Sequence, residues 1–193
     1  MALILASASP IRKAMLEAAG VEFLAVPADV DESALKDGAT LPGALALRLA
    51  EAKALEVSRR RPDDWVIGSD SVVSVGARRF DKPADRDEAA DHLRFFSGKA
   101  MTLTSAVALA RSCAIDWSYG GSAELNVRLL SDDFIRDYLD AEWLEVSYCV
   151  GVFRLEGRGV QLFESIYGDH FTILGMPLLP LLGALRERGL IAA

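Results

Sequence analysis

The segment over residues 7–13 crowds hydroxyl and cationic side chains into one short stretch. Ser9 and Pro10 are followed directly by Arg12 and Lys13 at close spacing. Proline favours the first position of a helix, and a helix N-terminus presents unpaired N–H groups and a positive dipole end. The segment is therefore a candidate cradle for a polyphosphate, although an ordinary Ser-Pro helix start with surface bases has the same pattern.

Another cation, Lys53, falls on the apolar stripe of a helix predicted over residues 41–60. Leu45 and Leu49 precede it at intervals of four, which is the spacing of one helix face. A lysine on that face either extends its ammonium group to solvent or meets a buried anion. A phosphate is the anion that would give Lys53 a role in binding.

Asp70 is the most informative single residue, because it follows a buried strand predicted over Trp65–Gly68. Ligands of open α/β sheets bind beyond the carboxyl ends of strands. Small residues, Ser69 and Ser71, flank Asp70 at this predicted end. A carboxylate there can hold a divalent cation or orient a water molecule; a turn-capping aspartate is the alternative.

Two loops add further candidate ligands. Asp31 and Glu32 offer hard oxygen atoms, and magnesium is usually held by one or two carboxylates together with substrate phosphates. Lys82 stands before Pro83 in a predicted loop, where it can clamp a second phosphate. Each of these residues also fits a solvated surface loop without a ligand.

The elements that must position these residues predict one α/β domain over residues 1–193. Because 51% of the 193 residues are hydrophobic, the chain can bury a sizeable core. Apolar runs alternate with helical patterns along the chain. The predicted strands cover 2–6, 21–26, 65–68, 101–110, 123–129 and 160–166, and the predicted helices begin near 10, 41, 85, 131 and 177. The expected helix caps are Ser9, Asp85 and Ser131, and the Gly120-Gly121 pair is an expected turn.

Charge, cysteine content and missing motifs exclude several classes of protein. The net charge of −7 opposes stable nucleic-acid binding, which usually needs a basic surface. Cys113 and Cys149 form no Cys-x-x-Cys pair, so they indicate two buried thiols in a reducing cytoplasm. P-loop, dinucleotide-binding and nucleophile-elbow motifs are absent from the sequence. With no basic leader and no apolar run of membrane length, we expect a cytoplasmic protein that does not bind membranes.

The ordered set of motifs resembles the Maf family of nucleoside triphosphate pyrophosphatases. The matching segments are Leu-Ala-Ser-Ala-Ser-Pro-Ile-Arg at 5–12, Val-Asp-Glu at 30–32, Ala-Glu-Ala-Lys-Ala at 50–54, Ile-Gly-Ser-Asp at 67–70, Lys-Pro at 82–83, Leu-Arg-Phe-Phe-Ser-Gly at 93–98 and Gly-Met-Pro-Leu at 175–178. They cover nearly the whole chain in the family's order. The resemblance implies an α/β fold with a twisted mixed sheet and flanking helices, arranged as two lobes around a central cleft.

The resemblance also implies an activity: a nucleoside triphosphate is hydrolysed between its α and β phosphates to the monophosphate and pyrophosphate. Asp70 is implied as the catalytic carboxylate and, together with Glu32, as a ligand of a divalent metal cation, Mg²⁺ or Mn²⁺. The residues implied to bind the triphosphate are Ser9, Arg12, Lys13, Lys53 and Lys82. A homodimer is a further expectation, and so is a role in removing modified nucleotides such as 7-methyl-GTP.

Three positions bear on the choice of nucleotide. A branch of the family that favours pyrimidine-type nucleotides has Arg, Thr and Gln where this chain has Ile11, Ser71 and Glu156. A branch that favours 7-methyl-GTP has Trp, Gln and Glu there, so this chain keeps only the Glu; residues 157–164 also lean toward this branch. The alternatives to an enzyme are a non-catalytic nucleotide-binding regulator of cell division and a nucleic-acid-binding regulator. The retained motif carboxylates and cations favour catalysis.

Overall fold

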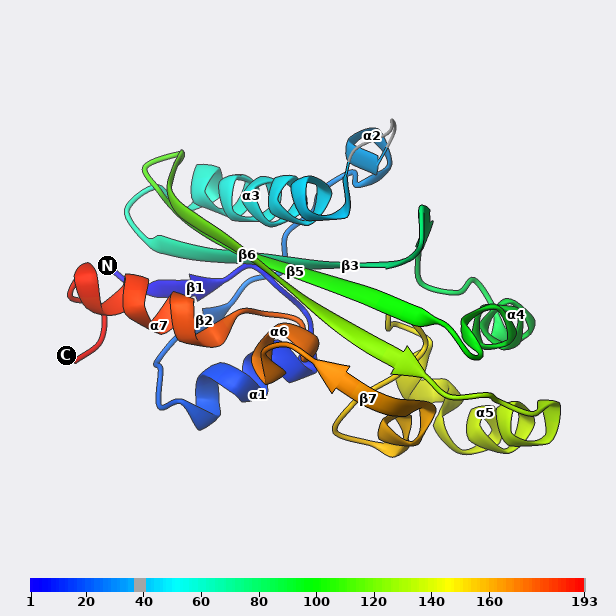
Figure 1. Cartoon of the computed structure of the whole chain (residues 1–193). Helices are drawn as coiled ribbons and strands as arrows, with labels where there is room; N and C mark the ends of the chain where they lie inside the picture. The colour runs from blue at the N-terminus through cyan, green and yellow to red at the C-terminus, as the bar shows by residue number, and fades with distance from the viewer. Residues whose placement is uncertain (37–40, 193) are drawn as a thin grey trace. The chain divides into compact units, whose positions relative to one another are not determined.

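The computed structural model describes residues 1–36 and 41–192, and within them the chain forms a mixed α/β fold, as predicted. A seven-stranded sheet has the order β2-β1-β3-β5-β6-β7, with β4 paired to β3 (Figure 1). The strand β1 is parallel to β2 and β3, whereas β3–β4 and β6–β7 are antiparallel. The strands are β1 Leu3–Leu5, β2 Leu24–Ala25, β3 Trp65–Val75, β4 Arg78–Phe80, β5 Ala100–Arg111, β6 Ala114–Val127 and β7 Phe163–Tyr167.

Helices flank this sheet along the chain. They are α1 Pro10–Ala18, α2 Ser33–Lys36, α3 Pro42–Arg60, α4 Arg86–Phe96, α5 Asp132–Val146, the 3-10 helix η1 Arg158–Leu162, α6 His170–Ile173 and α7 Leu178–Glu187. The chain divides into two compact units. The first unit comprises Met1–Ser71, Thr104–Ser122 and Asp169–Ala193, and the second comprises Val72–Leu103 and Ala123–Gly168. A single domain over residues 1–193 stays a prediction.

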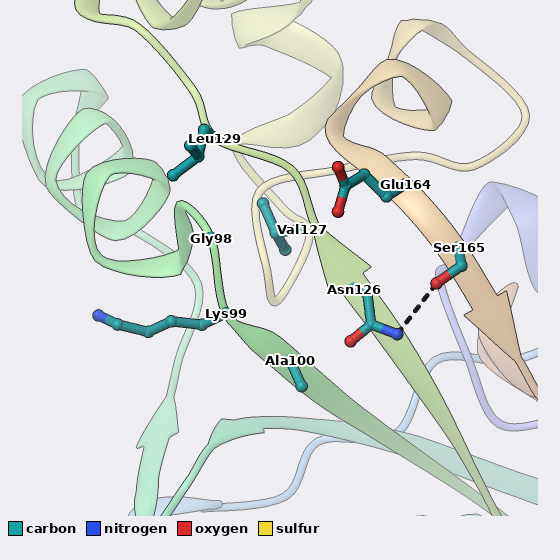
Figure 2. Close-up of a pocket in the computed structure, with 8 residues that line it drawn as sticks. All are labelled: Gly98, Lys99, Ala100, Asn126, Val127, Leu129, Glu164 and Ser165. Atoms are coloured by element: carbon teal, nitrogen blue, oxygen red, sulfur yellow. Dashed lines mark hydrogen bonds between the residues drawn. The ribbon is translucent and has the colours of Figure 1, made fainter.

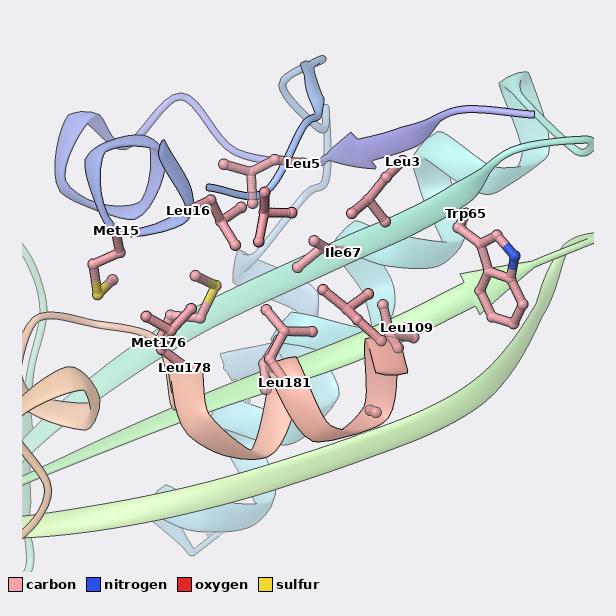
Figure 3. Packing of buried hydrophobic residues seen from close by; sticks show 14 residues of the cluster. Leu3, Leu5, Met15, Leu16, Trp65, Ile67, Leu109, Met176, Leu178 and Leu181 are labelled. Carbon is pink, nitrogen blue, oxygen red and sulfur yellow. The ribbon is translucent and has the colours of Figure 1, made fainter. Parts of the chain in front are cut away.

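The core of the first unit joins strands β1, β3 and β5 to helices α1 and α7. Figure 3 shows its apolar side chains, which include Leu5, Leu16, Ile67 and Leu181. These four side chains are completely buried, and each contributes about 1.5–3 kcal/mol relative to exposure. This packing fixes the positions of α1 and β3, the two elements that carry candidate site residues.

The strand β3 runs unbroken over Trp65–Val75, so the prediction that the buried strand ends at Ser69-Asp70 was wrong, whereas the extended conformation predicted over 71–75 is confirmed. Asp70 therefore lies inside a strand and not after one. Gly68 serves a different purpose: a Cβ there would lie 2.2 Å from the Ala50 carbonyl oxygen and 2.6 Å from the Ala54 nitrogen. The glycine is needed for the close approach of α3 to β3, and the strand continues because Val72 and Val73 remain buried.

The Gly120-Gly121 pair also lies inside a strand, β6, and the turn predicted there was wrong. The chain reverses earlier, at Ser112 and Cys113, which both have positive φ angles. A Cβ on Gly121 would lie 3.0 Å from Thr172 Oγ1. This glycine therefore permits close packing within the first unit.

The predicted helix caps are confirmed at the two positions where the capping side chain accepts a hydrogen bond from a backbone N–H three residues later. Asp85 accepts a hydrogen bond from the Glu88 N–H, and Ser131 accepts one from the Phe134 N–H. Ser9 occupies the N-cap position of α1, but its side chain makes no capping hydrogen bond; the Ser9 N–H instead donates to Ser7 Oγ at 3.1 Å. The remaining differences are small.

The strand predicted over 21–26 shortens to β2, and the strand predicted from 160 begins after η1. Cys113 is exposed and Cys149 is half-buried, so the prediction of two buried thiols was wrong. Within residues 1–36 and 41–192, no helix is both long and apolar enough to cross a membrane.

Candidate active site

Lys53 lies between two carboxylates in the first unit. Its Nζ is 2.5 Å from Asp70 Oδ1 and 2.7 Å from Glu32 Oε1. The side chains of Lys53 and Asp70 are only 16% and 13% exposed, so water screens this pair weakly. Two hard oxygen atoms from separate elements thus converge on one point.

The close contact of α3 with β3 explains why Lys53 meets Asp70. Residues two apart in a strand face the same side, so Asp70 shares the side of β3 on which Gly68 contacts Ala50 and Ala54. Lys53 belongs to the same turn of α3. Of the two alternatives that the sequence left open for Lys53, an ammonium group extended to solvent or contact with an anion, the structure shows the second, and the anion is a pair of carboxylates.

Glu32 joins the cluster from the segment just before α2. It also contacts Lys36 Nζ at 3.1 Å. Burial by itself raises the pKa of Glu32, but the hydrogen bonds and charges of Lys53 and Lys36 outweigh this effect and hold the pKa at about 2. Glu32 is therefore ionised at neutral pH.

Asp31, the other acid of this loop, bonds locally. Its Oδ1 accepts hydrogen bonds from the Ser33 N–H at 3.0 Å and from Ser33 Oγ at 2.6 Å. These bonds lower the pKa of Asp31. Asp31 thus orders the start of α2, which carries Lys36. We call Lys53, Asp70 and Glu32 the Lys53 cluster; the described contacts of Asp31 do not join it to this cluster.

Arg12 holds the backbone on both sides of Asp70. Its guanidinium donates to the Gly175 carbonyl at 2.9 Å, to the Ser69 carbonyl at 3.0 Å and to Ser71 Oγ at 3.1 Å. Burial lowers the pKa of Arg12, and the negative charges of Asp70 and Glu32 oppose this shift. An arginine remains protonated even so. Arg12 therefore adds a fixed positive charge next to the two carboxylates.

A chain of hydroxyl groups continues from Arg12. Ser71 Oγ lies 2.8 Å from Ser105 Oγ, and Ser105 Oγ donates to the Thr172 carbonyl at 2.7 Å. Because Ser105 gives its proton to that carbonyl, it can only accept from Ser71, whose hydroxyl also has the Gly175 carbonyl as an acceptor at 3.3 Å. Ser71, the predicted specificity residue, is thus engaged in hydrogen bonds within the protein.

The first turn of α1 carries the other residues predicted for phosphate binding in this unit. Ser9, Ile11 and Lys13 are all half-buried there, and the Lys13 N–H donates to the Ser9 carbonyl at 3.3 Å. They share this turn with Arg12. The structure therefore groups the N-terminal motif with Asp70 through the Arg12 side chain.

Lys82 and Glu156 belong to the second unit, where both are exposed. Both influence one thiol: the pKa of Cys149 is raised to about 11, mainly by burial and also by the charge of Glu156, whereas Arg154 and Lys82 oppose the increase. The charges of both predicted residues thus act on Cys149.

The second unit also has an open pocket of about 600 Å³ (Figure 2). It is lined by Gly98, Lys99, Ala100, Asn126, Val127, Leu129, Glu164 and Ser165. The Asn126 amide donates to Ser165 Oγ at 3.0 Å across one side. None of the site residues predicted from the sequence lines this pocket, so its size does not make it the candidate site.

The donor set of the Lys53 cluster suits a divalent cation that is shared with phosphates. Glu32 and Asp70 supply two convergent carboxylates, and magnesium is typically bound by one or two carboxylates plus substrate oxygens. Among the described residues, no group of three or more His, Cys, Asp or Glu side chains could hold a metal ion. A cage made entirely of protein ligands is therefore not found in that part of the chain.

Comparison with known proteins identifies the family of this chain. The family model described as Maf-like protein matches residues 2–188. The chain belongs to the Maf family. A protein from Rhizobium etli named 7-methyl-GTP pyrophosphatase is 50% identical over 193 residues, covering 98% of this chain and 97% of the relative. One of the same name from Rhizobium meliloti is 49% identical over 195 residues, covering 99% and 98%. A nucleoside triphosphate pyrophosphatase from Rhodopseudomonas palustris is 45% identical over 192 residues, covering 98% and 95%.

Some residues around the Maf motifs were missed by the sequence reasoning. Ser105 forms a hydrogen bond with Ser71, the Gly175 carbonyl accepts a hydrogen bond from Arg12, and Lys36 contacts Glu32. The only signal for Ser105 was a hydroxyl residue inside a buried apolar strand, where a polar group needs a partner. Gly175 stands in a Maf motif and has a φ angle of 108°, which favours glycine.

Proposed function

We propose that this Maf-family chain hydrolyses nucleoside triphosphates between the α and β phosphates and releases pyrophosphate. The observation that carries the proposal is the convergence of Asp70 and Glu32 on the single ammonium group of Lys53. The names of the three relatives support it, because each is called a pyrophosphatase of a nucleoside triphosphate or of 7-methyl-GTP. Such chemistry depends mainly on positioning and on charge neutralisation.

We propose that Glu32 and Asp70 hold a divalent cation, Mg²⁺ or Mn²⁺, during this reaction. When bound, such a metal polarises phosphate oxygens and favours a nucleophilic water. Lys53 and Arg12 neutralise charge on the triphosphate, and Ser9 and Lys13 assist from the first turn of α1. Asp70 has two carboxylate oxygens, so one can remain with a cation while the other accepts a hydrogen bond from the attacking water. The water oxygen bonds to the α phosphorus while one of its protons passes to Asp70, the P–O bond to the β phosphate breaks, and pyrophosphate leaves.

A nucleotide panel tests this activity. Pyrophosphate release is measured for standard and modified triphosphates with Mg²⁺ or Mn²⁺, and again with an excess of chelator. We expect release with metal and loss of turnover with chelator. Turnover that resists chelation, or orthophosphate as the first product in an assay free of inorganic pyrophosphatase, contradicts the proposal.

For the base, we propose that Glu156 selects guanine and that Lys82 neutralises a phosphate. An ionised carboxylate only accepts hydrogen bonds, and guanine offers two neighbouring donors, N1–H and the 2-amino group. Uracil and thymine present an acceptor, a donor and an acceptor, which suit a glutamine amide better. The positive charge of 7-methylguanine strengthens its pairing with Glu156, but Ile11 lacks the aromatic face that a tryptophan would add.

A comparison of kcat/KM for GTP, 7-methyl-GTP, UTP and TTP tests the role of Glu156. The wild type should prefer the guanine nucleotides, with weaker selection for the methylated form than the branch with tryptophan, and Glu156→Gln should move the ranking toward UTP and TTP. A wild-type preference for UTP or TTP, or an unchanged ranking in the variant, overturns this assignment. A cytoplasmic location, a homodimer and the removal of modified nucleotides stay predictions.

A further inference from the structure

The Lys53 ammonium group lies between the carboxylate oxygens of Asp70 and Glu32, the two candidate metal ligands. Its Nζ is 2.5 Å from one carboxylate and 2.7 Å from the other, whereas Mg²⁺ holds its oxygen ligands at about 2.0–2.1 Å. One point between two carboxylate oxygens cannot hold both cations. A metal ion that takes these same two oxygen atoms therefore displaces Lys53.

We propose that Lys53 is an internal substitute for the metal, so that a divalent cation binds well only together with a triphosphate. This inference rests on the proposed function and adds an order to its binding steps. In the free protein Lys53 occupies the metal position. In the substrate complex Lys53 moves to a phosphate oxygen and leaves both carboxylates to the metal.

The charges around the two carboxylates support this exchange. Lys53 contacts both of them, Lys36 contacts Glu32 at 3.1 Å, and the buried Arg12 guanidinium acts electrostatically on Asp70 and Glu32. Positively charged side chains thus already lie around both carboxylates. A lone divalent cation would add to this positive charge, whereas a triphosphate that arrives with it brings compensating negative charge.

The backbone around Lys53 is fixed, but its side chain can move. Helix α3 is held against β3 by the contacts of Ala50 and Ala54 at Gly68, where no Cβ fits. Lysine carries its charge on a flexible four-carbon stem. The exchange therefore needs only rotation of the Lys53 side chain, with Asp70 held in place by Arg12 through Ser69 and Ser71.

The metal ion and the nucleotide should each strengthen the binding of the other. Because binding couplings are reciprocal, a nucleotide that raises the metal affinity must gain affinity from the metal by the same factor. The free protein then leaves cellular metal unbound until a substrate arrives.

Lys36 provides a matched control for Lys53. Both lysines contact Glu32, but among the described contacts only Lys53 also reaches Asp70. Lys36→Met removes a positive charge without vacating the position between the carboxylates. Lys53→Met removes the same charge and vacates it.

The experiment titrates Mn²⁺ into each protein without nucleotide and follows free Mn²⁺ by electron paramagnetic resonance. We expect weak binding to the wild type, at least about tenfold tighter binding to Lys53→Met, and a much smaller gain for Lys36→Met, since a coupling of 1–3 kcal/mol corresponds to about 5–150-fold. Asp70→Asn combined with Lys53→Met should lose the gain. Lys53→Gln replaces Lys53→Met if the latter does not give a folded circular-dichroism spectrum.

Equal Mn²⁺ affinity of the wild type and the Lys53 variant overturns the inference, and so does an equal gain from Lys36→Met. A titration of the wild type with a non-hydrolysable α,β-methylene triphosphate adds the second arm: Mg²⁺ should tighten its binding at least about fivefold, and no effect of Mg²⁺ contradicts the coupling. Neither readout needs turnover. A protein that passes both arms but releases no pyrophosphate keeps the inference about Lys53 and loses the proposed function.

Discussion

Several cations among the described residues contact two carboxylates each, and two of these clusters are built in opposite ways. They are the Lys53 cluster in the first unit and, in the second unit, an Arg154 cluster of Arg154, Glu142 and Glu145. The Lys53 cluster joins α3, β3 and the segment before α2. The Arg154 cluster joins residues of one short stretch of chain.

The Arg154 cluster holds a local loop. Glu142 and Glu145 lie one turn apart on α5, and the guanidinium contacts them through separate nitrogens at 3.5 and 2.8 Å. The following chain packs tightly on Arg154: a Cβ on Gly159 would lie 2.5 Å from the Arg154 carbonyl oxygen. This cluster therefore stabilises the path of the chain from α5 to η1.

The Lys53 cluster instead directs both carboxylates at one ammonium group. Gathering poorly exposed charges from three separate elements carries a desolvation cost that ion pairing need not recover. A cluster that only stabilises a local loop, as the Arg154 cluster does, would not need charged groups from separate elements to meet at one point. The difference teaches that convergence on one point, more than the number of ion pairs, marks a position that suits a metal and a phosphate.

Replacing Asp70 should produce the largest loss of turnover among the changes that compare the two clusters. Asp70→Asn keeps the side-chain shape and removes the charge, so turnover should fall at least about a hundredfold, as for other groups that act directly on the transition state. Steady-state pyrophosphate release measures the loss. Glu145→Gln, the equivalent change in the Arg154 cluster, should leave turnover unchanged. A folded Asp70→Asn protein with near wild-type turnover removes Asp70 from this role.

Gly68→Ala should separate the elements that form the Lys53 cluster. The new Cβ would lie 2.2 Å from the Ala50 carbonyl oxygen, a backbone atom that cannot rotate away. We expect a loss of about 1–3 kcal/mol in the free energy of unfolding, as for other overpacked sites, and lower turnover. Urea denaturation measures the loss. Gly120→Ala is the control, because no atom lies within 4 Å of a Cβ at Gly120; equal stability of the two variants contradicts the account.

Acid should weaken the Lys53 cluster through Glu32. The folded protein lowers the pKa of Glu32 from 4.5 to about 2, so its ionised form stabilises the fold fully above pH 4.5, and this contribution is lost as the pH falls toward 2. Carboxyl carbon NMR should find Glu32 titrating near pH 2 in the wild type and at higher pH in Lys53→Met. Titration at the same pH in both proteins would show that Lys53 does not lower this pKa.

The smallest effect is expected at the edge of the Arg154 cluster. Glu145 is 59% exposed, and exposed ion pairs contribute about 0–1 kcal/mol. Glu145→Gln should therefore lower the free energy of unfolding by less than about 1 kcal/mol, measured by urea denaturation. A loss well above this value, or a fall in turnover, erases the contrast between the two clusters.

Local features of this fold could be predicted from the sequence, whereas features that depend on distant contacts could not. The caps at Asp85 and Ser131 involve a residue three positions away, and both were predicted correctly. The role of Gly68 depends on its contact with α3, which strand periodicity does not reveal, and the strand was predicted to end just after it, at Ser69-Asp70.

The same limit applied at the candidate site. Helix periodicity directed Lys53 inward, but it could not tell which anion Lys53 would meet. Arg12 donates to Gly175, which lies 163 residues along the chain, and periodicity carries no information about such a contact. The motif order of the Maf family named these residues together, and the structure supplies their distances.

The most direct test of the central claim is the identity of the products. Phosphorus NMR follows GTP or 7-methyl-GTP with the wild-type protein and Mg²⁺, with Asp70→Asn as the blank. Hydrolysis at the site of the Lys53 cluster predicts equal amounts of nucleoside monophosphate and pyrophosphate from the wild type and neither product from Asp70→Asn. Nucleoside diphosphate with orthophosphate, or the same products at the same rate from Asp70→Asn, would contradict the account.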